Sequence, residues 1–149
     1  GAGVLEAVAA ARLAFDRDAA TAEAHAHWAL DRLGVGELAG ESCDGLPAAL
    51  RRRVELARAL VRRPAVLLLD EPAAGLTDGE KADLAALLRD LAGEGMAILL
   101  VEHDMGFLLP LAGRVLCLDR GQLIYDGPAG EVRRDQAVAT AYLGRAGSA

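Results

Sequence analysis

The sequence has few of the features that mark disulfide-rich, metal-binding or membrane-spanning proteins. Its two cysteines, Cys43 and Cys117, lie far apart and belong to no CxxC or Cys/His pattern, which argues against a zinc site or a disulfide framework. The longest apolar runs, such as residues 65–69 and 96–101, are well short of the ~20 residues that cross a bilayer. We therefore expect two reduced cysteines and no transmembrane segment.

Basic residues are outnumbered by acidic ones. Sixteen Lys and Arg stand against 22 Asp and Glu, a formal net charge of −6, so a broad electrostatic grip on nucleic acid is not expected. No charged start followed by an apolar stretch and a cleavage site is visible, so we expect no secretory signal and cytosolic residence. With 53% hydrophobic residues among 149, the chain has enough apolar surface for one compact domain.

The hydrophobic pattern predicts an α/β fold. Helical periodicity, alanine-rich composition and a proline at a first turn predict helices over residues 4–15, 19–33, 47–61, 79–92, 105–111 and 130–143. Strands are predicted over residues 65–69, 96–101, 114–118 and 122–125. The first two strands are unbroken apolar runs separated by a helix, which is typical of parallel strands buried on both faces of a sheet. The last two flank a tight turn and predict a hairpin.

Two carboxylates stand at the end of the first apolar run. Residues 66–71 read Val-Leu-Leu-Leu-Asp-Glu, so Asp70 and Glu71 emerge at the carboxyl end of a strand, where ligand sites of parallel sheets lie. In P-loop ATPases an Asp in this position holds the Mg²⁺ that bridges the β- and γ-phosphates. A second carboxylate can orient or deprotonate the attacking water. Taken alone, the hexapeptide also fits a buried strand that ends in a polar turn.

A histidine follows the second apolar run. Residues 98–104 read Ile-Leu-Leu-Val-Glu-His-Asp. Because neighbouring parallel strands end at the same edge of a sheet, His103 is predicted to converge with Asp70 and Glu71 on one site. A lone histidine after a strand is more often a loop or capping residue, so this prediction depends on the pairing of the two strands.

Three segments together resemble a known family. Residues 53–60 read RVELARAL, residues 67–72 read LLLDEP and residues 101–104 read VEHD. In order and spacing they resemble the nucleotide-binding subunits of ABC transporters, and the resemblance covers nearly the whole chain. The wording of residues 71–76 and of the terminal 141–144 is most similar to the branched-chain amino acid importer branch.

The resemblance implies a partial P-loop NTPase fold of the ABC type, a mostly parallel sheet with flanking helices and a helical subdomain. Residues 1–61 would form that subdomain and the signature helix, and residues 62–149 the carboxy-terminal part of the ATPase core. By the resemblance, Asp70 is the Walker B aspartate that holds Mg²⁺ through water. Glu71 is the catalytic glutamate, and His103 is the switch histidine that contacts the γ-phosphate. The D-loop is formed by Ala74, Gly75, Leu76 and Thr77.

The phosphate-binding P-loop of this family is missing from the sequence. The motif G-x-x-x-x-G-K-[ST] is needed because backbone N–H groups and a lysine hold the phosphates. Lys81 is the only lysine, and no Ser or Thr follows it. The adenine-stacking aromatic residue and the glutamine loop of the family are missing as well. The chain alone is therefore predicted not to hydrolyse ATP and not to bind ATP or Mg²⁺ tightly.

The signature segment departs from the family pattern. Where the family typically has LSGGQ, this chain has Leu46, Pro47, Ala48, Ala49 and Leu50. In the family the serine and a glycine amide hydrogen-bond the γ-phosphate held by the opposite subunit. Pro47 has neither a hydroxyl nor an N–H, and the alanine methyl groups obstruct a close approach. We predict a weak or inactive composite site, and Thr77 departs further because the family has an aspartate there.

The favoured hypothesis is a carboxy-terminal fragment of an ABC transporter ATPase subunit. In complete form it would bind and hydrolyse ATP with Mg²⁺ to drive uptake of branched-chain amino acids. Its implied partners are a second ATPase subunit and the permease subunits that hold it at the cytoplasmic face of the membrane. Uncovered sheet edge and apolar surface predict self-association of the isolated chain.

Two alternatives remain open from the sequence. The first is a non-catalytic interaction or assembly module with a degenerate ABC fold, which the altered signature favours and the intact Asp70, Glu71 and His103 disfavour. The second is the carboxy-terminal lobe of a chromosome-maintenance type ATPase, which the lack of sustained heptads disfavours.

Overall fold

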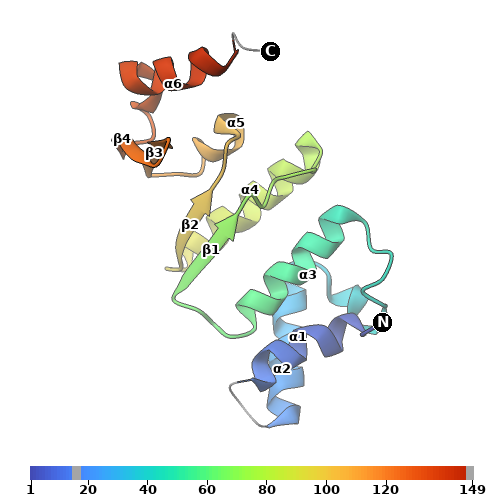
Figure 1. Ribbon diagram of the computed structural model, residues 1–149. Helices are drawn as coiled ribbons and strands as arrows, with labels where there is room; N and C mark the ends of the chain where they lie inside the picture. Colours follow the sequence, from blue (N-terminus) through green and yellow to red (C-terminus); the bar gives the residue numbers. More distant parts are fainter. Residues whose placement is uncertain (15–17, 147–149) are drawn as a thin grey trace. The chain divides into compact units, whose positions relative to one another are not determined.

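The computed structural model describes residues 1–14 and 18–146, and its account of burial ends at residue 141. The chain divides into two compact units, Gly1–Val101 and Glu102–Ala149. The first contains α1 (Val4–Leu13), α2 (Ala19–Arg32), η1 (Gly36–Gly40), α3 (Ala48–Leu60), β1 (Val66–Asp70), α4 (Asp78–Gly93) and β2 (Ala97–Val101) (Figure 1). The second contains α5 (Met105–Leu108), β3 (Arg114–Asp119), β4 (Gln122–Pro128), η2 (Val132–Arg134) and α6 (Gln136–Ala146). Among the described residues, no helix combines the length and the apolar character needed to cross a membrane.

Helices α1, α2 and α3 contact one another and form a helical cluster. The buried faces of α1 and α2 contain short side chains four positions apart, such as Val4 and Val8 on α1 and Ala22 and Ala26 on α2. Residues four apart lie on one face of a helix, and small side chains let the helix axes approach closely. The helices predicted over residues 4–15 and 19–33 are confirmed as Val4–Leu13 and Ala19–Arg32, with residue 15 outside the described residues. The subdomain boundary between residues 61 and 62 stays a prediction.

Charged side chains tie this cluster to α4. Arg53 donates one hydrogen bond to the carbonyl of Leu33 at 3.1 Å and another to Asp83 of α4 at 3.4 Å. Arg32 of α2 pairs with Glu94 at the end of α4. Arg53 of the basic run 51–53 thus connects helices within the first unit.

Trp28 lies partly at the surface of the helical cluster. Its side chain is 38% exposed on α2, and the guanidinium carbon of Arg63 lies 5.0 Å from the centre of its ring. The helical cluster buries alanines and a leucine on the neighbouring face of α2 instead. The indole therefore packs against a cation at the surface, an arrangement that the helical periodicity alone does not indicate.

Strands β1 and β2 pair in parallel, from Val66 opposite Ala97 to Asp70 opposite Val101. The chain between them forms α4, which contacts β2 and buries one leucine-rich face (Figure 1). This is the strand, crossover helix, strand unit that the sequence predicts. Among the described residues no further strand pairs with either of them, so each strand has one unpaired edge.

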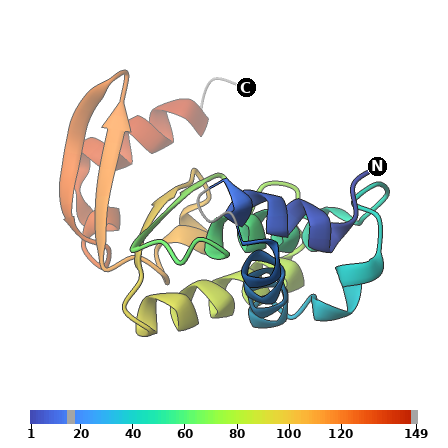
Figure 2. The ribbon, with the colours of Figure 1, turned by 90° about the horizontal axis from the view of Figure 1, so that it is seen from below.

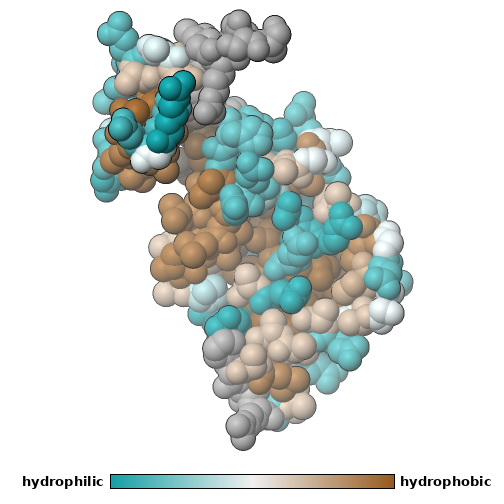
Figure 3. All heavy atoms as spheres, in the orientation of Figure 1, coloured by the Kyte–Doolittle hydropathy of each residue, from teal (hydrophilic) through white to brown (hydrophobic). Residues whose placement is uncertain are grey.

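Only one face of this sheet is covered, which corrects the prediction that both strands are buried on both faces. Leu67 and Leu69 are buried. On the opposite face the exposed fractions of Val66, Leu68, Leu99 and Val101 are 53%, 68%, 53% and 55%. Figure 3 shows the resulting hydrophobic area over β1 and β2. An apolar run on both faces predicts burial only where two covering layers exist, and the first unit provides one. We call this surface, with Asp70 at its end, the bare face.

The second unit is a hairpin packed against a helix. Strands β3 and β4 are antiparallel, and the turn residues Arg120 and Gly121 have φ values of 48° and 80°, the double positive φ of a type I′ turn. Its core is built from Val115, Val132 and Val138 together with Ala129, with α6 lying along the hairpin (Figure 2). The predicted hairpin and terminal helix are confirmed.

Candidate functional site

Asp70 stands at the carboxyl end of β1, on the bare face. Alternate residues of a strand point to the same side, so Asp70 shares its face with Val66 and Leu68. All three are exposed. The pairing of Asp70 with Val101 places this carboxylate where both parallel strands end. The carboxylate of Asp70 therefore lies at one end of an apolar surface.

Glu71 follows directly and has an unusual backbone conformation. Its φ is 44°, in the left-handed region, and its N–H donates to the carbonyl of Val101 at 2.9 Å. A residue other than glycine in that region costs of order 1–3 kcal/mol, and such residues cluster at active sites. The backbone thus fixes the start of the Glu71 side chain at the edge of the sheet.

The segment that resembles the D-loop is a tight exposed turn. The N–H of Ala74 donates to the carbonyl of Glu71 at 3.1 Å, and the N–H of Leu76 donates to that of Ala73 at 3.2 Å. Gly75 has a φ of 75°, which L side chains rarely adopt. These bonds hold the turn directly after the acid pair. Its contact with a second subunit stays a prediction.

Thr77 has a structural role at the start of α4. Its hydroxyl accepts from the N–H of Glu80 at 3.4 Å, and the Glu80 carboxylate accepts from the N–H of Thr77 at 2.7 Å. This reciprocal pair is a capping box. The backbone hydrogen bond from Thr77, followed by the one from its hydroxyl, holds the pKa of Glu80 below its usual value. Where the family has an aspartate, this chain therefore has a helix cap.

Replacing Thr77 with alanine should destabilise the chain by about 1 kcal/mol, because α4 loses its cap, whereas Thr77→Asp should retain most of the stability. The fold lowers the pKa of Glu80, so the carboxylate's contribution is present at neutral pH. It is lost as the pH falls below the usual glutamate pKa of about 4.3 and through the lower folded value. Urea unfolding at neutral pH and at a pH below the folded pKa of Glu80 measures the loss of stability. Glu80→Gln should remove the part of the acid dependence that comes from this carboxylate. Equal stability of Thr77→Ala and the parent chain would contradict the assignment.

The segment predicted to be the signature, residues 46–50, lies at the start of α3. Pro47 is the N-cap of α3 and makes no side-chain capping hydrogen bond, while its carbonyl accepts the first helical bond from Arg51 at 2.9 Å. Pro47 and Ala48 are exposed, and Leu46, Ala49 and Leu50 are partly buried. A contact between these residues and a nucleotide stays a prediction.

His103 belongs to the second unit, two residues after the end of β2, and its side chain is exposed. The next residue, Asp104, caps the short helix α5, since one of its carboxylate oxygens accepts from the N–H groups of Gly106 at 2.9 Å and Phe107 at 3.2 Å. Asp104 therefore has a local structural role. The γ-phosphate contact assigned to His103 stays a prediction.

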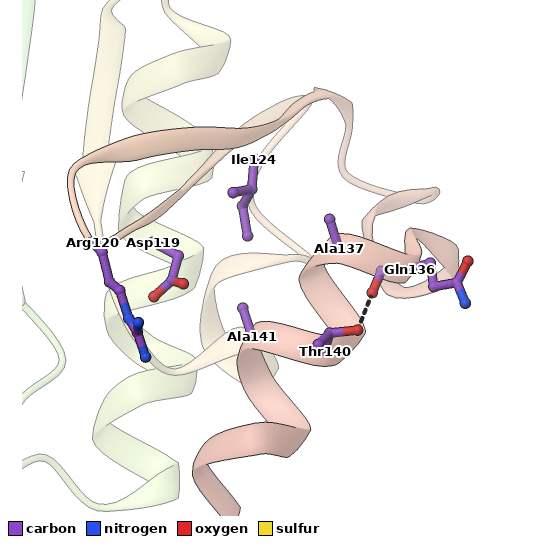
Figure 4. Close-up of a pocket in the computed structure, with 7 residues that line it drawn as sticks. All are labelled: Asp119, Arg120, Ile124, Gln136, Ala137, Thr140 and Ala141. Carbon is purple, nitrogen blue, oxygen red and sulfur yellow. Dashed lines mark hydrogen bonds between the residues drawn. The ribbon is translucent and has the colours of Figure 1, made fainter.

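A hollow of about 690 Å³ lies in the second unit, between the hairpin and α6 (Figure 4). It is lined by Asp119, Arg120, Ile124, Gln136, Ala137, Thr140 and Ala141. The hydroxyl of Thr140 donates to the carbonyl of Gln136 at 2.8 Å, a bond within α6. None of the predicted nucleotide-site residues lines this hollow, so it is separate from the acid pair.

Asp70 is the residue of the first unit that is predicted to bind a metal ion. Among the described side chains, no group of three or more His, Cys, Asp and Glu residues is placed to hold a metal ion. Mg²⁺ is commonly held by one or two carboxylates together with water and substrate phosphates, so a single carboxylate fits such a role. The Mg²⁺ contact assigned to Asp70 stays a prediction.

Comparison with known proteins places these features in a family context. Residues 4–74 match the family model described as ABC transporter. The chain is 38% identical over 122 residues to the high-affinity branched-chain amino acid transport ATP-binding protein BraF of Pseudomonas aeruginosa, covering 81% of this chain and 48% of that protein. It is also 38% identical over 114 residues to the phosphonates import ATP-binding protein PhnC of Frankia casuarinae, covering 76% and 45%. The chain thus spans about half the length of the curated relatives it matches.

Solved structures of ABC transporter cassettes have the same fold as this chain. The structure of the ADP conformation of MJ1267, an ATP-binding cassette of an ABC transporter, matches with a TM-score of 0.83 at 23% identity, covering 95% of this chain and 63% of that one. This likeness confirms the mixed α/β cassette fold. The sequence matches and the fold together identify the chain as part of an ABC transporter ATP-binding domain.

Proposed function

We propose that this chain is the carboxy-terminal part of an ATPase subunit that, once completed by a P-loop segment, hydrolyses ATP to drive uptake. The observation that carries the proposal is the acid pair: Asp70 and Glu71 leave a parallel strand pair at its carboxyl edge, with Glu71 in the left-handed region. Phosphoryl transfer depends on positioning and charge stabilisation. An exposed carboxylate held by the backbone at a sheet edge is suited to position a water molecule.

Each predicted site residue of this chain would have a separate role in ATP hydrolysis. Asp70 would hold Mg²⁺ through water, and Mg²⁺ would neutralise charge on the β- and γ-phosphates. Glu71 would orient the attacking water or accept its proton. His103 would donate a hydrogen bond to the γ-phosphate. The start of α3 and the turn at residues 74–77 would face the nucleotide held by a second ATPase subunit.

Branched-chain amino acids are the proposed cargo of the complete transporter. BraF, whose printed name includes branched-chain amino acid transport, matches over 81% of this chain, slightly more than the phosphonate protein at equal identity. The cargo would be selected by other subunits. The partners would be a second ATPase subunit and permease subunits, which would hold the chain at the cytoplasmic face of the membrane.

A non-catalytic assembly module is the second candidate. The observation in its favour is the uncapped, proline-led start of α3, which offers no hydroxyl to a phosphate. Such a module would retain the fold and the docking of partners without turnover.

Co-expression separates the two. The chain is produced with the part of the Pseudomonas BraF protein that precedes the matched 122 residues, here called the front segment, to give a reconstituted cassette. Phosphate release from ATP is expected from the reconstituted cassette and not from the chain alone. Assembly without phosphate release would favour the second candidate. Phosphate release by the chain alone, above that of a Glu71→Gln variant, would contradict the proposal that a P-loop segment is required.

A further inference from the structure

The sequence contains three Asp–Gly pairs and no asparagine. The pairs are Asp44–Gly45, Asp78–Gly79 and Asp126–Gly127. Glycine has no Cβ, so the backbone nitrogen that follows such an aspartate is open to the approach of the aspartate side chain. An Asp–Gly pair can therefore close into a cyclic imide wherever the surrounding backbone lets the nitrogen and the carboxyl carbon meet.

Asp44 and Gly45 lie in an exposed turn between η1 and α3 (Figure 1). The Asp44 side chain is 79% exposed. Gly45 has a φ of 83°, and apart from its chain neighbours no atom lies within 4 Å of the place where a Cβ would stand. Among the described residues, no hydrogen bond engages the Gly45 N–H. The attacking nitrogen of this pair therefore has neither a hydrogen bond to lose nor a neighbour to displace.

The contacts of Asp44 leave this reaction open. The Gly1 ammonium lies 3.5 Å from the Asp44 carboxylate, but an ion pair this exposed contributes little. The backbone N–H of Asp44 donates to the Ser42 hydroxyl at 3.1 Å. Neither contact involves the Gly45 nitrogen, so neither opposes ring closure directly.

The pair at the start of α4 is held in a helical conformation. Asp78 and Gly79 are enclosed by the capping box that Thr77 and Glu80 form. The N–H of Lys81 donates to the carbonyl of Thr77 at 2.9 Å, which closes the first turn. A helical ψ turns the following nitrogen away from the side chain, so this turn has to open before Gly79 can reach the Asp78 carboxyl group.

The pair in β4 is held by strand pairing and by a charge. Asp126 and Gly127 pair with Leu116 and Val115 of β3. Both carboxylate oxygens of Asp126 accept from Arg114, at 2.7 and 2.8 Å, and these hydrogen bonds lower the pKa of Asp126. Ring closure releases a carboxyl oxygen as water, so a carboxylate that stays ionised is a poor partner for the nitrogen. This pair is protected both by its backbone and by its charge.

We propose that Asp44–Gly45 is a modification site at which aspartate isomerises spontaneously to isoaspartate. The Gly45 nitrogen forms a bond to Cγ of Asp44 and loses its proton, and one carboxyl oxygen leaves as water. Water then adds to one of the two ring carbonyl carbons. Addition at Cγ breaks the new bond and restores aspartate, whereas addition at the backbone carbonyl carbon breaks the original peptide bond and leaves the chain running through Cγ. The water that was lost is regained, so no oxidant, reductant or other reactant is consumed.

The modification acts on the start of α3. The N–H of Cys43 donates to the carbonyl of Ala2 at 3.2 Å, which ties down the chain before the pair. Isoaspartate adds one methylene group to the backbone, and the added length falls between Cys43 and Pro47, the N-cap of α3. The reaction takes place whether or not residues 46–50 contact a nucleotide, so this inference is independent of the proposed function.

Incubation of the purified chain tests the site. The native chain and the chain unfolded in guanidinium chloride are incubated side by side in water labelled with the heavy oxygen isotope. Peptide mass spectrometry with electron-transfer fragmentation then measures isoaspartate and incorporated label at each Asp–Gly pair. In the native chain we expect isoaspartate at position 44 to exceed that at positions 78 and 126 by about tenfold or more, because the other two pairs must open first. In the unfolded chain the three pairs should react at similar rates.

A matched pair of variants identifies the reacting carboxyl group. Asp44→Glu keeps the charge and Gly45, but its imide ring is larger and closes far more slowly, so the signal at position 44 should be lost. Asp90→Glu removes another exposed aspartate and should leave that signal unchanged. Methyl transfer from S-adenosylmethionine by an isoaspartyl methyltransferase provides a second readout and should fall in Asp44→Glu alone. Equal isoaspartate at the three pairs of the native chain, or a signal at position 44 only after unfolding, would overturn the proposal.

Discussion

Replacing Glu71 with glutamine should lower the kcat of the reconstituted cassette by about 10²- to 10⁴-fold, the usual effect of losing a general acid–base group. Glutamine keeps the size of the side chain but cannot accept a proton from water. The KM for ATP should change little, because Glu71 acts on the attacking water and not on ground-state binding. Steady-state phosphate release measures both constants. Glu23→Gln, on α2, removes another exposed carboxylate and should leave kcat within about twofold.

Replacing Glu71 with glycine distinguishes the effect of the backbone conformation on stability from the effect of the carboxylate on turnover. A Cβ in the left-handed region costs about 1–2 kcal/mol, and the flexibility of glycine returns about 0.5–1 kcal/mol of that. Glu71→Gly should therefore be more stable than Glu71→Ala, while both lack turnover. At Ala86, an exposed position inside α4, the order should reverse and glycine should cost about 1 kcal/mol. If kcat survives in Glu71→Gln, the role of this carboxylate is wrong even where the backbone result agrees.

The order of helices and strands was predictable because local patterns determine it. The spacing of Val4 and Val8, or of Ala22 and Ala26, indicates a helix face wherever the helix packs. Apolar runs located β1 and β2 in the same way. What the pattern could not indicate is which faces are covered. Leu68 is as apolar as Leu67, and its exposure depends on a second covering layer that the first unit does not contain.

The candidate site was predictable in its residues and not in its geometry. The motif located Asp70 and Glu71, but no residue type signals that Glu71 adopts a φ of 44°. One signal was present and was assigned differently: Thr77 and Glu80 have the spacing of a capping box, and the resemblance assigned Thr77 to the D-loop. A residue can serve both purposes, since a cap fixes the backbone that precedes the helix.

Restoring the signature should raise turnover of the reconstituted cassette by about 10²- to 10⁴-fold. The change is Pro47→Ser with Ala48→Gly and Ala49→Gly, which supplies a hydroxyl and removes two methyl groups at the start of α3. Two hydrogen bonds to a charged phosphate contribute about 1.5–3 kcal/mol each, and each 1.4 kcal/mol is about tenfold. ATP turnover by the purified variant, compared with the parent, measures the effect.

The controls separate the phosphate contact from helix stability. Serine at the N-cap stabilises a helix by about 0.5–2 kcal/mol relative to a residue that cannot cap, whereas each glycine within a helix costs about 1 kcal/mol. Ala19→Gly with Ala20→Gly places the same two glycines at the exposed start of α2, and should cost similar stability without changing turnover. Unchanged turnover in the folded triple variant would show that the start of α3 does not meet the nucleotide.

The expected gain in turnover depends on how strongly the present start of α3 still attracts a phosphate. The dipole of α3 still favours an anion at Pro47, but that contribution is only about 0.3–1 kcal/mol and salt screens it. Pro47 also has no N–H to donate, and it makes no side-chain capping bond at the start of α3. The dipole would let two cassettes approach each other. Without a directional hydrogen bond from the start of α3, the γ-phosphate would be positioned poorly. Pro47→Ser alone should therefore recover part of the turnover, about tenfold, because one directional hydrogen bond outweighs the dipole.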